Sequence, residues 1–72
     1  MKKKAREMVD RIKTMTGCEA MYSAALGMIQ LHDASQERIW NAIRTLRHTG
    51  ELKFDNCERR LDGEYVAVFY RT

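Results

Sequence analysis

Polar and basic side chains that can bind nucleic acid are concentrated between positions 36 and 47. This segment holds two amides, three arginines and the only tryptophan of the chain: Gln36, Arg38, Trp40, Asn41, Arg44 and Arg47. An arginine can donate paired hydrogen bonds to guanine, and an amide side chain can pair in a similar way with adenine. Arginine also binds phosphate oxygens. The residue types therefore indicate a segment that can contact both bases and the phosphate backbone.

The same segment has the spacing of an amphipathic helix. Its apolar residues recur at helical intervals and predict one buried side: Ile39, Ala42, Ile43 and Leu46. Asp33 or Ser35 can accept a backbone N–H at the start of this helix, and Gly50 provides a stop signal. We therefore expect a helix over about 35–48 whose opposite side is free to meet a partner.

Position along this helix separates two kinds of contact. Residues near the start of a recognition helix reach base edges, so the candidates for base contact are Gln36, Arg38 and Asn41. Arg44 and Arg47 lie further along and are candidates for phosphate contact. Each assignment has an alternative, because the arginines can be solvated surface charges and Trp40 can cover the edge of the core or an oligomer interface.

Two further helices are expected before this one. The first has an apolar side made of Ala5, Met8, Val9, Ile12 and Met15, and it ends near 14–17. The second is expected over roughly 19–30, on the spacing of Met21, Ala24, Ala25, Met28, Ile29 and Leu31. Gly27 lies inside this second helix and weakens it by about 1 kcal/mol relative to alanine.

The pattern changes after Gly50. Residues 52–55 alternate apolar and polar and predict a short strand, and 64–71 have the β-branched and aromatic composition of a second strand. The polar stretch 56–63 ends in Asp-Gly and predicts the loop of a hairpin. Arg59 and Arg60 lie in that loop among several acidic residues, which weaken a phosphate contact there.

The element order helix, helix, helix, strand, strand resembles the winged helix-turn-helix DNA-binding domain, most closely over residues 34–54. The resemblance is carried by Ile39, the pair Ala42-Ile43, Leu46, Gly50 and Leu52. It implies an α+β domain of three helices and a C-terminal two-stranded hairpin, as in small phage or plasmid regulators. Helix 35–48 would then enter the major groove, and loop 56–63 would act as the wing, where Arg59 and Arg60 touch the flanking backbone or minor groove.

Length and composition limit the other possibilities. The chain has 72 residues, a net charge of +3 and no proline, which predicts one domain over 1–72 with 1–4 as a mobile basic tail. No apolar run approaches the about 20 residues that cross a bilayer, and no secretory signal is found, so we expect a cytoplasmic protein. The two cysteines and two histidines lack metal-ligand spacing, so we expect no cofactor, no metal and no enzyme activity.

Two functions remain open at this stage. The first is a sequence-specific double-stranded DNA-binding protein that regulates transcription. We expect it to act as a homodimer or as cooperative neighbours on adjacent half-sites, with strand 65–70 or the first helix supplying the contact. The second is a winged-helix module that binds another protein, for example an anti-repressor or an adaptor, and never touches DNA. Glu37 and the mixed charges of the hairpin favour the second function. Salt dependence separates the two, because phosphate contacts weaken steeply as salt rises.

Overall fold

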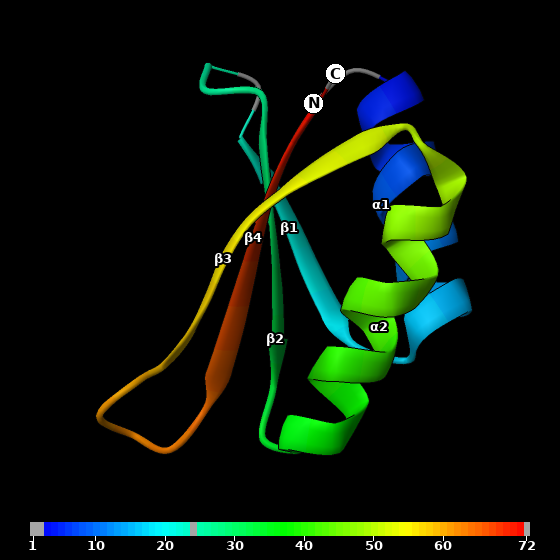
Figure 1. The fold of residues 1–72 in the computed structure, drawn as a ribbon. Coiled ribbons are helices and arrows are strands. Elements are labelled where there is room, and N and C mark those ends of the chain that lie inside the picture. The colour runs from blue at the N-terminus through cyan, green and yellow to red at the C-terminus, as the bar shows by residue number, and fades with distance from the viewer. Residues whose placement is uncertain (1–2, 24, 72) are drawn as a thin grey trace.

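Two αββ units follow each other along the chain. The computed structural model describes residues 3–23 and 25–71, with the elements α1 (Lys3–Thr16), β1 (Glu19–Ser23), β2 (Met28–Asp33), α2 (Gln36–Thr49), β3 (Leu52–Arg59) and β4 (Tyr65–Arg71). The strands form one antiparallel sheet in the order β1-β2-β4-β3. Both helices lie on the same side of this sheet (Figure 1). The inner strands of the two units, β2 and β4, therefore meet in the middle.

The predicted second helix over 19–30 is wrong, and with it the predicted order of three helices followed by a hairpin. β1 pairs with β2 from Glu19↔His32 to Ser23↔Met28. Gly27, just before β2, has φ +62°, which lies outside the range of a right-handed helix. The likeness to winged helix-turn-helix domains therefore does not extend to the fold, which is α+β with strands on both sides of α2.

Side chains along β1 and β2 point alternately toward the helices and away from them, and this alternation explains why the segment forms a hairpin and not a helix. Ile29 and Leu31 point toward the helices and are fully buried, and in β4 they pair with Phe69 and Ala67. A helix over 19–30 would leave the apolar side of β4 without these partners. Burying a side chain such as Leu31 contributes about 1.5–3 kcal/mol, which exceeds the small differences in helix propensity.

The other predicted elements are found with changed limits. The first helix is confirmed as α1, with Val9 and Ile12 buried, although Met15 is 43% exposed and not part of the core. Ala5 lies outside the side chains that the structure describes. Of the predicted tail 1–4, residues 1 and 2 lie outside the described range, and Lys3 begins α1. No described helix is long and apolar enough to span a bilayer.

The C-terminal hairpin is longer than predicted. β3 continues through Arg59, so residues 56–59 belong to a strand and not to the predicted loop 56–63. The connection is a short turn in which the Arg60 N–H donates to the Glu64 carbonyl at 2.7 Å. The register of β3 against β4 shifts between Phe54 and Asn56, which places a bulge at position 55. Leu52 is buried and Phe54 and Cys57 are partly buried, and the side chains between them are polar and exposed.

Replacing Gly27 with alanine tests the hairpin. The left-handed backbone at Gly27 disfavours a Cβ, although the space around it is open, so Gly27→Ala should lower the free energy of unfolding by about 1–2 kcal/mol. Gly27→Asn should cost less, because asparagine tolerates this conformation. Urea unfolding followed by circular dichroism measures both. A gain in stability for Gly27→Ala is the result expected of a helix and would contradict the hairpin.

Candidate nucleic-acid interface

Both ends of α2 are fixed by capping contacts. The Ser35 hydroxyl accepts from the Arg38 N–H at 3.2 Å, and the Asp33 carboxylate accepts from the Ser35 N–H at 2.8 Å. Ser35 is therefore the N-cap, one of the two residues predicted for this role. Gly50 ends the helix with φ +71°, the left-handed conformation typical of a C-terminal glycine. These contacts hold α2 as a regular helix from Gln36 to Thr49.

The buried side of α2 is the one predicted. Four side chains point into the core: Ile39, Ala42, Ile43 and Leu46. With that side fixed, the outward side of the helix carries Glu37, Asn41, Arg44 and His48, all of them exposed. Neither β3 nor β4 covers this side, so the side chains of Asn41 and Arg44 are accessible to a partner.

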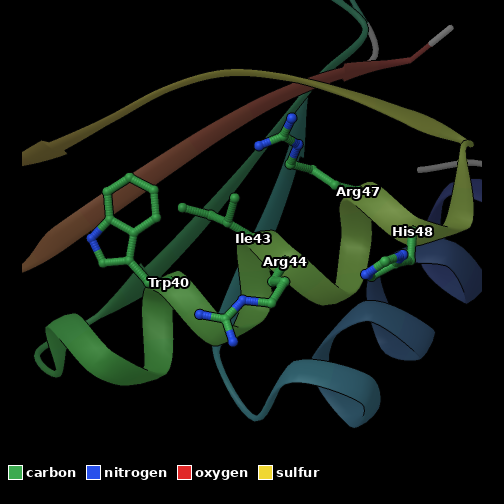
Figure 2. Close-up of a pocket in the computed structure, with 5 residues that line it drawn as sticks. All are labelled: Trp40, Ile43, Arg44, Arg47 and His48. Atoms are coloured by element: carbon green, nitrogen blue, oxygen red, sulfur yellow. The ribbon is translucent and has the colours of Figure 1, made fainter.

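A shallow hollow lies along the flank of α2 next to its outward side. It has a volume of about 380 Å³ and is lined by Trp40, Ile43, Arg44, Arg47 and His48, a set that we call the α2 hollow. Figure 2 shows Trp40 and Arg47 pointing toward the strands, with Arg44 turned further outward. The five residues recur at intervals of three and four, which places them along one strip of the helix.

An aromatic chain anchors one end of the α2 hollow. The ring centroid of Trp40 is 6.4 Å from that of Phe54, which is in turn 5.4 Å from that of Phe69 in the core. Trp40 nevertheless remains 44% exposed. Trp40 therefore covers the edge of the core and also presents part of its ring to solvent. Because Phe54 belongs to β3, this contact also ties the flank of α2 to that strand.

The α2 hollow is positively charged. Within residues 3–23 and 25–71 the recorded ion pairs are Arg11–Glu51, Lys13–Glu19 and Arg38–Asp33. Arg44 and Arg47 take part in none of these pairs. The negative end of the helix dipole attracts Arg47 and His48, but that end is equivalent to only about half a charge. Two full guanidinium charges therefore dominate the field of the hollow.

The structure separates the other predicted residues from this group. Arg38 lies on the opposite flank, where its guanidinium is 3.6 Å from the Asp33 carboxylate. Gln36 begins α2, and Asn41 lies on its outward side. Arg59 and Arg60 are at the end of the β3–β4 hairpin and do not line the hollow. Of the eight predicted residues, the hollow thus unites Trp40, Arg44 and Arg47.

Ile43 and His48 were not among the predicted contact residues, although they line the hollow. His48 follows Trp40 by eight positions and Arg44 by four, and this spacing could have identified it. Ile43 was assigned only to the core. It is almost fully buried and forms the floor of the hollow. The helical spacing of the apolar residues identifies Ile43 as a core residue and does not reveal this second role.

The two cysteine thiols both have a raised pKa and lie far apart in the sheet. Burial raises the pKa of the Cys18 thiol, and the charge of Asp33 raises it further. Burial also raises the pKa of Cys57, with a smaller effect from Glu58. Cys18 adjoins one edge strand and Cys57 lies on the other, and three strand spacings of about 4.8 Å exceed the reach of a disulfide. Among the described residues, no three His, Cys, Asp or Glu side chains are grouped to hold a metal ion.

No protein-family model, curated protein or solved structure matches the chain. The likeness to winged helix-turn-helix domains therefore has no support beyond the α2 segment itself. The chemistry of the α2 hollow is the feature from which a function can be inferred.

The fluorescence of Trp40 provides a direct measure of charge in the hollow. Because Arg44 and Arg47 attract anions, iodide should quench Trp40 more strongly in the wild type than in Arg44→Gln/Arg47→Gln. The difference should shrink as salt is added. Acrylamide is neutral and should quench both proteins equally. Equal iodide quenching of the two proteins would show that the arginines set no local field.

Stability should depend on the Cys18 thiol at alkaline pH. Its pKa is raised above 9.0 in the folded chain, so its contribution is complete below pH 9 and is lost as the pH rises through the folded pKa. The urea midpoint of the wild type should therefore fall more steeply as the pH rises above about 9 than that of Cys18→Ala. All other groups are shared by the two proteins, so their effects cancel in the comparison. Parallel pH profiles would contradict this assignment.

Proposed function

We propose that the protein binds double-stranded DNA through α2 and acts as a small regulator of transcription. The observation that carries this proposal is the pairing of Arg44 and Arg47 beside Trp40, on the exposed flank of a helix whose ends and buried side are fixed. Neither arginine pairs with a carboxylate in the described part of the chain. A phosphate is the partner that fits two adjacent guanidinium groups best.

The dimensions of α2 suit a DNA groove. Its 14 residues give a length of about 21 Å, and a helix of this width fits the major groove. Arg44 and Arg47 are three residues apart, so their Cβ atoms are separated by about 5–6 Å and can reach neighbouring phosphates. Asn41 lies on the outward side of the same helix, where its amide is the candidate for reading a base.

Glu37 determines which half of α2 approaches the DNA backbone. It lies in the first turn, where a carboxylate stabilises the positive end of the helix dipole but repels phosphate. The C-terminal half, with Arg44, Arg47 and His48, has no such repulsion along the α2 hollow. We therefore assign phosphate contact to this half. Arg59 and Arg60, at the tip of the hairpin, are candidates for a contact with the flanking backbone.

Salt-dependent binding tests the proposal. The dissociation constant for a mixed-sequence duplex, measured by fluorescence anisotropy, should rise steeply with salt. Arg44→Ala/Arg47→Ala should weaken binding and reduce the slope of log K against log salt by about 1.8, the value for two lost phosphate contacts. Circular dichroism should show that the variant folds, because both side chains are exposed.

Arg38→Ala is the matched control. It removes one guanidinium charge from the same helix, but from the flank where the guanidinium faces Asp33, so the salt slope should change little and by less than the about 0.9 expected for one lost phosphate contact. Equal slopes for the wild type and the double variant would remove α2 as the DNA contact. A duplex that does not bind even at low salt, where phosphate contacts are strongest, would instead favour the protein-interaction function.

A further inference from the structure

One face of the sheet has no covering layer in the described part of the chain. The helices pack on the opposite face (Figure 1), and we call the uncovered one the open face. The register of the strands places the side chains of the open face in three rows that run across the sheet. The middle row contains no ionisable group and consists of Met21, Gln30, Val68 and Asn56. Met21 belongs to this row and is 59% exposed.

The two outer rows of the open face carry opposite charges. One row begins with Glu19 and ends with Glu58, and the other ends with Lys53 next to Tyr70. Glu19 also lies 3.6 Å from the Lys13 ammonium group of α1, whereas Glu58 has no recorded ion pair in the described chain. His32 lies in the row of Glu19 and Glu58, and the three rows contain one lysine and no arginine, so this face lacks the cluster of basic groups that binds nucleic acid. A protein surface with the same alternation of acid, neutral and basic rows would complement it.

We propose that this surface is the open face of a second copy, packed about a two-fold axis that runs across the strands. Rotation about that axis reverses the strand direction and keeps β3 over β3. Glu58 of each copy then faces Lys53 of the other, and the uncharged middle rows meet. An axis along the strands would place Glu19 over Glu58 of the second copy, and this like-charge contact is unfavourable. The charges therefore select one of the two axes.

The edges of the sheet are less suited to self-association than its open face. The β3 edge is interrupted by the bulge at Asp55 and carries the exposed Lys53, two features that oppose strand addition. The β1 edge offers only the five residues from Glu19 to Ser23. The open face instead presents Met21 and Tyr70 together with the partly buried Val68. Face-to-face packing buries these three side chains in both copies.

This dimer also positions the α2 hollows, a consequence that rests on the proposed function. Trp40 contacts Phe54 of β3, so each hollow faces the β3 edge, and the selected axis brings both β3 edges to the same side. Stacked sheets lie about 10 Å apart, and a helix of about 10 Å diameter packed on each places the two α2 axes about 30 Å apart. This spacing approaches the about 34 Å between half-sites one turn apart on DNA.

Charge reversal tests the dimer in the absence of DNA. Sedimentation equilibrium of the full chain should give a dimer at micromolar to millimolar concentration. Lys53→Glu and Glu58→Lys should each weaken association by at least about tenfold, because each creates two like-charge contacts. An equimolar mixture of the two variants should regain the wild-type affinity, since both contacts in the mixed dimer are again attractive. Glu7→Lys makes the same charge change as Glu58→Lys on exposed α1 and should leave association unchanged.

A wild-type chain that sediments as an 8.5 kDa monomer over this range would overturn the proposal. A mixture that stays as weak as the single variants would also overturn it, because the pairing of Lys53 with Glu58 would then be absent. Circular dichroism of each variant confirms that it is folded. A dimer that fails to bind DNA contradicts only the proposed function, since association is measured without nucleic acid.

Discussion

The antiparallel pairing of β2 with β4 is the contact on which the rest of the structure depends. It joins the two αββ units along a register from Met28↔Tyr70 to Asp33↔Tyr65. On the helical side of this seam, Ile29 and Phe69 are completely buried and form the platform on which both helices pack. The same seam determines where α2 lies over the sheet, and it therefore fixes which side of α2 is exposed. The α2 hollow is thus a product of strand pairing as much as of the helix sequence.

Much of α2 could be predicted from the sequence because its signals agree with one another. The apolar spacing from Ile39 to Leu46, the cap at Ser35 and the stop at Gly50 all indicate the same helix, and the structure confirms each of them. The hairpin over β1 and β2 could not be predicted in this way. Met21, Met28 and Leu31 fit a helical period, and only pairing with β4, which is distant in sequence, shows that alternation decides their burial.

The candidate site was predicted in composition but not in arrangement. The residue types identified Trp40, Arg44 and Arg47, but the flank to which each one points depends on how α2 is rotated against the sheet. That rotation directs Arg38 to Asp33 and leaves Arg59 and Arg60 at the tip of the hairpin. The hollow also needs Phe54 of β3 to support Trp40, and no local pattern in the sequence links these two residues.

The connection between the two αββ units is short, since only Ala34 and Ser35 separate β2 from α2. If β2 and β4 separate, each αββ unit exposes an unpaired strand. That strand can pair with its partner strand in the same chain or in a neighbouring chain. Two opened chains can therefore exchange their C-terminal halves and rebuild both seams with native contacts. A domain-swapped form of this protein would keep the core interactions of the monomer, and it would change the path of the chain through positions 34 and 35 together with the contact of the Ser35 N–H with Asp33.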